Sequence, residues 1–64
     1  MQNKLIRRPE VETLTGLSRS TIYEWINSGR FPKPLQLGPR TVAWREADIL
    51  EWIESRPVAG KVLQ

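Results

Sequence analysis

Hydrophobic residues recur with helical spacing in three short stretches of this chain, and glycines or prolines separate the stretches. The pattern predicts helices over residues 9–15, 18–28 and 46–56. A proline suits the first turn of the first helix, and glycines end the first and second helices because glycine adopts the left-handed conformation without steric cost. The apolar stripes of these helices, with the residue that joins the first two, predict a core containing Val11, Leu14, Leu17, Ile22, Trp25, Ile26, Ile49, Trp52 and Ile53.

Only three residues, Gly16, Leu17 and Ser18, join the first two helices. A connection that short, with a glycine in it, fits the sharp corner of a helix-turn-helix. We expect Leu17 to fill the corner and Ser18 to cap the second helix through its side-chain oxygen.

The stretch between the second and third predicted helices is not helical, because it contains three prolines. Apolar residues alternate with polar or small ones on both sides of Gly38 and Pro39, which predicts a two-stranded hairpin. Arg40 lies at its tip, where an arginine enters a minor groove, pairs with a phosphate or is simply solvated. We expect the hairpin to add three side chains to the core, Leu37, Val42 and Trp44.

The chain has 64 residues and contains neither cysteine nor histidine. This composition removes disulfides, thiolate or imidazole metal sites and the usual nucleophile–base pairs, so we expect no enzyme, no metal and no cofactor. No stretch approaches the roughly 18 consecutive apolar residues of a membrane span, and the N-terminus lacks the apolar region of a secretory signal. We therefore expect a cytoplasmic protein without membrane contact, with one domain over residues 1–56 and a flexible tail over 57–64.

The charges are unevenly distributed around a formal net charge of +3. Most arginines and lysines lie in the first three quarters of the chain, whereas four acidic residues fall in the last predicted helix, Glu46, Asp48, Glu51 and Glu54. This asymmetry predicts a basic face, an acidic back and a polyanionic partner.

The second predicted helix carries hydrogen-bonding side chains opposite its apolar stripe. Two interpretations are open: the solvated side of an ordinary amphipathic helix, or a surface that reads the edges of DNA bases. Arg19 suits a guanine or a phosphate, and Glu24 either accepts a hydrogen bond from a cytosine amino group or holds an arginine in place. Tyr23 either donates to a phosphate or packs its ring under the first helix. The candidate contact residues of this helix are Ser18, Arg19, Ser20, Tyr23, Glu24 and Asn27.

Three motifs in fixed order, "GLSRSTIYEWI", "GRFPKP" and "W-R-E-x-D-I-x-x-W-I", closely resemble the AlpA family of small phage and mobile-element regulators. The resemblance runs from Leu5 to Arg56. It implies a mainly α protein with a small β-hairpin, a winged helix-turn-helix of the excisionase-like and MerR-like type. The helix from Ser18 would enter the major groove of double-stranded DNA. The wing and its flanks would add contacts from Lys33, Gly38, Arg40 and Arg45.

One position departs from the general helix-turn-helix pattern, which prefers a small residue after Val11 where this chain has Glu12. We expect either a more open crossing of the two helices or a Glu12 side chain that turns out to solvent.

The resemblance implies a transcriptional regulator of a prophage or mobile element, acting on integrase or excision genes. Two alternatives stay open: an excisionase that bends attachment-site DNA, and a protein-interaction module such as an antirepressor. A short helix reads few base pairs, and no heptad pattern supplies a dimerisation arm. We therefore expect a monomer in solution that assembles cooperatively on DNA or beside a partner such as integrase or RNA polymerase.

Overall fold

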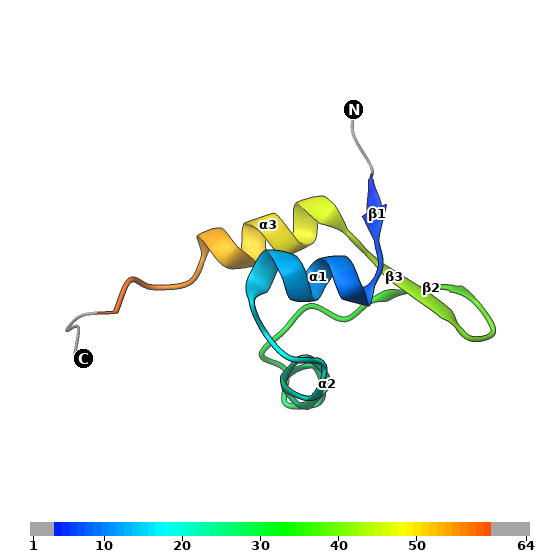
Figure 1. Ribbon diagram of the computed structural model, residues 1–64, viewed down its shortest axis with the longest axis horizontal. Coiled ribbons are helices and arrows are strands. Elements are labelled where there is room, and N and C mark those ends of the chain that lie inside the picture. The colour runs from blue at the N-terminus through cyan, green and yellow to red at the C-terminus, as the bar shows by residue number, and fades with distance from the viewer. Residues whose placement is uncertain (1–3, 60–64) are drawn as a thin grey trace.

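The computed structural model describes residues 4–59 and contains three helices and three short strands. In Figure 1, α3 runs above α1, α2 is viewed along its axis below α1, and the β2–β3 hairpin extends to the right. The helices lie close to the predicted ranges, although α3 ends two residues before the predicted boundary. The elements in chain order are β1 (Leu5–Ile6), α1 (Arg8–Thr15), α2 (Arg19–Asn27), β2 (Leu35–Gly38), β3 (Thr41–Arg45) and α3 (Glu46–Glu54).

The sheet has one strand more than the hairpin that the sequence predicts. Its antiparallel order is β1-β3-β2, so β3 is central. β1 aligns Ile6 with Trp44, and the backbone N–H of Glu46 donates to the Lys4 carbonyl at 2.8 Å. A two-residue strand is too short to show alternation, which is why the sequence pattern does not reveal it. β1 ties the start of the described chain to the start of α3.

A single hydrophobic cluster holds the elements together. Five partly buried side chains pack against its fully or almost fully buried centre: Leu17, Trp25, Ile26, Trp52 and Ile53. The centre takes residues from β1, β3, all three helices and the connector between α2 and β2. Its members are Ile6, Val11, Ile22, Phe31, Trp44 and Ile49.

The connector between α2 and β2 is fixed by two tryptophans. The Phe31 ring packs edge-on against both indoles, with ring centroids 4.7 Å from Trp52 and 6.5 Å from Trp44. The indole N–H of Trp44 donates to the Pro32 carbonyl at 2.9 Å, and that of Trp52 donates to the Arg30 carbonyl at 2.9 Å. These contacts give an irregular, proline-rich segment a defined path, because its ring and two of its carbonyls all have partners.

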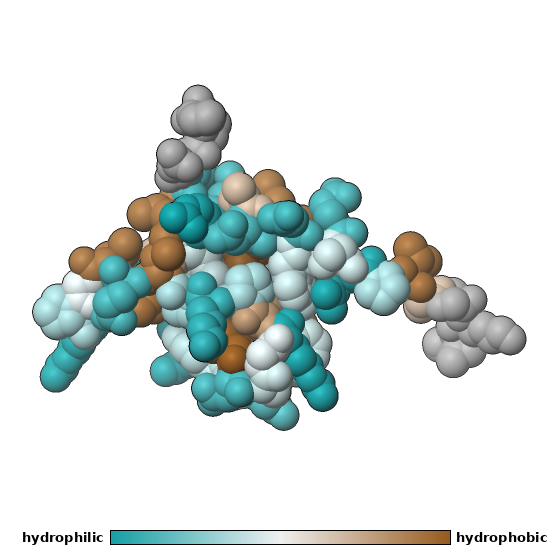
Figure 2. Space-filling view, turned by 180° about the vertical axis from the view of Figure 1, so that it is seen from behind, coloured by the Kyte–Doolittle hydropathy of each residue, from teal (hydrophilic) through white to brown (hydrophobic). Residues whose placement is uncertain are grey.

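The prediction that Leu37 lies in the core is wrong, and the register of the hairpin explains why. β2 pairs Leu35 with Ala43 and Gln36 with Val42. The register is irregular between Gln36 and Gly38, so the alternation of inward and outward side chains is broken at Leu37, close to the hairpin turn. Leu37 is 50% exposed, and Leu5 on β1 is 43% exposed. Figure 2 shows hydrophobic residues gathered on the hairpin side of the molecule.

Leu14 is also wrongly predicted as core, since 40% of it is exposed. α1 has only eight residues and buries one of them, Val11. Leu14 lies three residues further on, about 60° around the helix from Val11, and falls outside the narrow strip that touches the core. A two-turn helix therefore supplies one core side chain instead of two.

The longest helices among residues 4–59 have nine residues, and none of them has the length and apolar character needed to cross a membrane. Residues 57–59 have no regular secondary structure, and Val58 is 92% exposed. The rest of the predicted tail, residues 60–64, lies outside the described residues.

We expect Trp44→Ala to destabilise the domain most among its tryptophan truncations. Truncating a buried aromatic residue costs ~3–5 kcal/mol, and the variant also leaves the Pro32 carbonyl without its indole donor. Trp52→Ala shifts stability in the same direction but by less, because Trp52 is partly exposed. Thermal and urea unfolding measure both effects. The matched control is Leu37→Ala on the exposed sheet face, and a Trp44→Ala melt that coincides with it would contradict the expectation.

Candidate nucleic-acid interface

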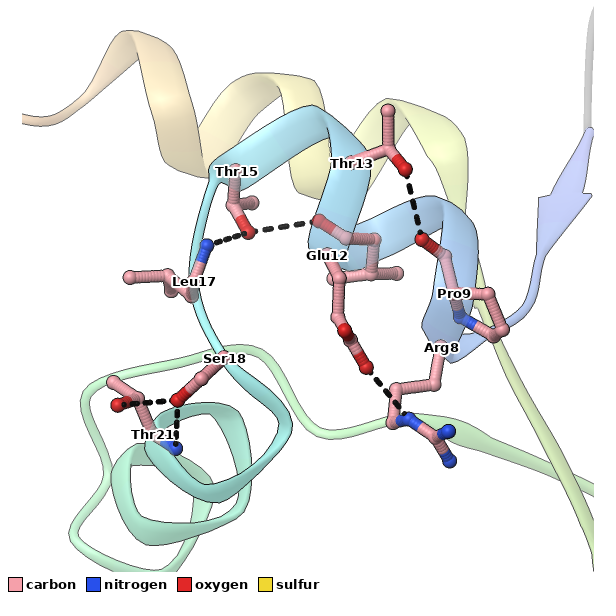
Figure 3. Close-up of polar contacts among 9 residues, drawn as sticks. Arg8, Pro9, Glu12, Thr13, Thr15, Leu17, Ser18 and Thr21 are labelled. Carbon is pink, nitrogen blue, oxygen red and sulfur yellow. Dashed lines mark hydrogen bonds and ion pairs between the residues drawn. The ribbon is translucent and has the colours of Figure 1, made fainter.

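The corner between α1 and α2 is held by backbone conformation and one hydroxyl. Gly16 has φ +75°, and its N–H donates to the Glu12 carbonyl at 2.8 Å. The Thr15 hydroxyl donates to the Val11 carbonyl at 2.8 Å and accepts from the Leu17 N–H at 3.2 Å (Figure 3). Leu17 packs partly buried against the core. The corner therefore sets the direction in which α2 leaves α1.

Both ends of α2 have defined caps. Ser18 Oγ accepts from the Thr21 N–H at 3.2 Å and pairs with the Thr21 hydroxyl at 3.0 Å (Figure 3). At the other end, Gly29 has φ +79°, and the Arg30 N–H donates to the Trp25 carbonyl at 2.7 Å. These caps confine α2 to Arg19–Asn27 and fix which of its side chains face outward.

The outward face of α2 carries polar side chains that have no ion-pair partner within residues 4–59. Ile22 on the inner face is fully buried. Neither Arg19 nor Glu24 forms a salt bridge with a described residue. Glu24 thus holds no described arginine in place in the free protein, and its carboxylate is available to a partner. The exposed residues of this face are Arg19, Ser20, Glu24 and Asn27.

Tyr23 lies at the edge of the same face. It is 39% exposed, so part of the side chain is open to solvent while the rest is covered. It lines a cleft together with two arginines at the start of α1, Arg7 and Arg8. The phenolic hydroxyl is therefore placed among cationic groups, where it can donate a hydrogen bond to an anion.

Glu12, the residue that departs from the helix-turn-helix pattern, pairs with Arg8. Arg8 Nε donates to Glu12 Oε2 at 2.8 Å across one helical turn (Figure 3), and about a third of each side chain is exposed. The hydrogen bond to Glu12 raises the pKa of Arg8, and Tyr23 adds to the effect. The Glu12 carboxylate is thus held in an ion pair with Arg8 and is only partly exposed, instead of standing free in solvent.

The hairpin brings Arg40 to the start of α1 and the middle of α2. Arg40 follows Pro39 in the turn between β2 and β3, and it lines the cleft that also contains Arg7, Arg8 and Tyr23. In the sequence, Arg7 and Arg8 contribute only to the general basic charge of the first three quarters of the chain. No local pattern marks them, because their approach to Arg40 depends on how α1 packs beside the hairpin.

The three other predicted contact residues of the wing and its flanks do not line this cleft. Arg45 is at the far end of β3 from the hairpin turn, and its guanidinium pairs with Asp48 at 3.6 Å. Lys33 is exposed in the α2–β2 connector. Gly38 is at the end of β2, where it pairs with Thr41.

The acidic residues of α3 form a separate region. Asp48 and Glu51 line a shallow cleft with Pro32 and Trp52, near the connector and away from the hairpin turn. Within residues 4–59, acidic residues do not gather into a group that could hold a metal ion. Asp48 and Glu51 therefore lie beside the connector and not on the outward face of α2.

Comparison with known proteins assigns the chain to a family. Residues 4–57 match the family model described as prophage CP4-57 regulatory protein (AlpA). The chain belongs to the AlpA family. It is 41% identical over 59 residues to a protein of Escherichia coli K12 named DNA-binding transcriptional activator AlpA, covering 83% of this chain and 84% of that protein. It is also 47% identical over 60 residues to the uncharacterized protein ORF88 of enterobacteria phage P4, covering 94% of this chain and 67% of that protein.

Membership of the AlpA family confirms the resemblance found in the sequence motifs. The matched span covers the α1–α2 corner, the hairpin and α3. The outward face of α2 and the arginine-lined cleft both lie within it, so the candidate interface is part of the AlpA domain itself.

We expect Gly16→Ala to destabilise the protein by about 1–2 kcal/mol. A Cβ at this position meets no atom within 4 Å, so the cost comes from the left-handed backbone alone. Gly38→Ala is the matched control, because its φ is not in the left-handed region and its Cβ would make only ordinary contacts at 3.8 Å. Thermal unfolding of both variants measures the difference, and equal melting temperatures would show that the corner does not depend on this conformation.

Proposed function

We propose that this protein is a sequence-specific DNA-binding transcriptional regulator of a prophage or mobile element. The observation that supports this most directly is the outward face of α2, whose polar side chains have no ion-pair partner among residues 4–59 and lie beside a cluster of arginines. A stable helix that leaves such side chains free suits the major groove, which presents a distinct pattern of donors and acceptors for each base pair. The name of the E. coli relative, DNA-binding transcriptional activator, supports the same function.

In this proposal the domain is a winged helix-turn-helix, with α2 as recognition helix and the β2–β3 hairpin as the wing. Arg40 at the hairpin turn contacts the DNA backbone or the adjacent minor groove. Arg19 grips a guanine or a phosphate near the start of α2. The Ser18 cap leaves the first backbone amides of α2 near a DNA phosphate, and a helix N-terminus favours such an anion.

Glu24 is the proposed specificity residue. A carboxylate that faces DNA weakens binding in general, because it repels phosphates. It is retained without loss of affinity where it accepts a hydrogen bond from a cytosine amino group. The absence of a salt bridge to Glu24 among the described residues supports this role over that of an arginine anchor.

The proposed targets are integrase or excision genes. Because one short helix reads few base pairs, the protein binds repeated or inverted half-sites, as a monomer that assembles cooperatively on DNA or beside integrase or RNA polymerase. Nuclease footprinting of the purified protein on the DNA around its own gene, the nearest integrase gene and the attachment site tests this. We expect protection of spaced repeats at a promoter, with affinity that falls steeply as salt rises.

Other footprinting outcomes separate the alternatives. Protection and bending confined to the attachment site would assign an excisionase role instead of promoter regulation. No protection at low salt would overturn DNA binding and direct the search to a protein partner, as for an antirepressor.

Two variants test whether Arg40 contacts the DNA backbone and Glu24 contacts a base. We expect Arg40→Ala to weaken binding to all duplexes by a similar factor, because it contacts backbone. Glu24→Ala should lose roughly 1–3 kcal/mol of discrimination at one base pair, because it contacts a base edge. Fluorescence anisotropy on a set of single-base-pair variants of the protected site measures both. Equal losses on every duplex for both variants would contradict the assignment.

A further inference from the structure

A small cleft opens where the start of α1, the middle of α2 and the hairpin turn meet. Its volume is about 160 Å³. The three elements that form it are far apart in the sequence and meet only in the folded domain. The lining residues are Arg7, Arg8, Pro9, Tyr23, Arg40 and Val42.

The cleft concentrates positive charge that the described chain balances only in part. Arg8 is paired with Glu12 at 2.8 Å, which fixes the direction of its guanidinium. Arg7 and Arg40 form no salt bridge with a carboxylate of residues 4–59. Arg7 occupies the N-cap position at the start of α1, but its side chain forms no capping hydrogen bond. Its guanidinium therefore has no part in capping the helix. Like charges gathered at one point repel unless an anion lies between them.

The donors of the cleft suit one kind of ligand. Its polar side chains are three guanidiniums and a tyrosine hydroxyl, and no carboxylate lines it. The other two lining residues, Pro9 and Val42, offer no side-chain hydrogen bonds. A wall of N–H and O–H donors around a small volume fits a tetrahedral oxyanion such as a phosphate, to which arginine donates two parallel hydrogen bonds.

The cleft also borders the outward face of α2 through Tyr23, which belongs to both. From these observations we infer that the cleft seats a single DNA backbone phosphate, shared between Arg7 at the start of α1 and Arg40 at the hairpin turn. The inference rests on the proposed DNA-binding function and adds a specific site to it. Arg8, oriented by Glu12, and the Tyr23 hydroxyl complete the set of donors. One phosphate thus connects the helix-turn-helix to the hairpin.

The salt dependence of binding tests whether Arg7 and Arg40 share one phosphate. Each neutralised phosphate contributes about 0.9 to the slope of log affinity against log salt concentration. Affinities of the parent, Arg7→Ala, Arg40→Ala and the double variant are measured by anisotropy on a duplex that contains the footprinted site. We expect each single variant to lower the slope by less than about 0.9 and the double variant to lower it by about 0.9 in total.

The matched control is Arg56→Ala, which removes one positive charge near Trp52 at the end of α3, away from the cleft. It should leave the slope at the parental value. If Arg7→Ala behaves like Arg56→Ala, or if the double variant loses about 1.8, the shared seat is refuted, because Arg7 then contacts no phosphate or a separate one. A parent that shows no salt-dependent binding would refute the proposed function itself, so the two failures are distinct.

A second measurement identifies the anion as part of DNA. Duplexes that carry one neutral methylphosphonate are scanned across the site. We expect one position at which the substitution weakens binding of the parent severalfold but leaves the affinity of the Arg7→Ala/Arg40→Ala variant nearly unchanged. The absence of any such position would show that the cleft holds no DNA phosphate. Thermal unfolding of every variant checks that the exposed substitutions leave the fold intact.

Discussion

The orientation of α2 depends on how the α2–β2 connector is held. Phe31 packs between the rings of Trp44 and Trp52, and the two indole N–H groups donate to the carbonyls on either side of it. Trp44 belongs to the central strand and Trp52 to the last helix, so these contacts join α2 to the rest of the domain. In a chain without disulfides or metal ligands of cysteine and histidine, this aromatic packing fixes the orientation of α2.

The candidate interface follows from that constraint. The caps of α2 determine which side chains project outward, and the core contacts of Ile22 determine that this face points away from the domain. β1, by pairing with β3, places the start of α1 beside the sheet and carries Arg7 toward the hairpin turn. The arginine-lined cleft is therefore a property of the complete fold and not of the helix-turn-helix alone.

Much of this fold is predictable from the sequence, because its signals are local. Pro9, Ser18 and the two left-handed glycines mark the helix ends, and helical spacing identifies Ile22 as an inward position. What the sequence misses depends on contacts between distant segments. β1 is too short for a pattern, the burial of Phe31 depends on two distant tryptophans, and Leu37 faces outward because of a cross-strand register. The face of α2 was recognisable from its residue types, whereas the meeting of Arg7 with Arg40 required the tertiary structure.

The separation of charge in this fold has a consequence for kinetics. Arg7, Arg8 and Arg40 line one cleft, whereas Asp48 and Glu51 of α3 line another. Such a separation of charge favours an approach to a polyanion in which the arginines lead. Encounters then begin in a nearly productive orientation, which raises the association rate at low ionic strength more than it slows dissociation.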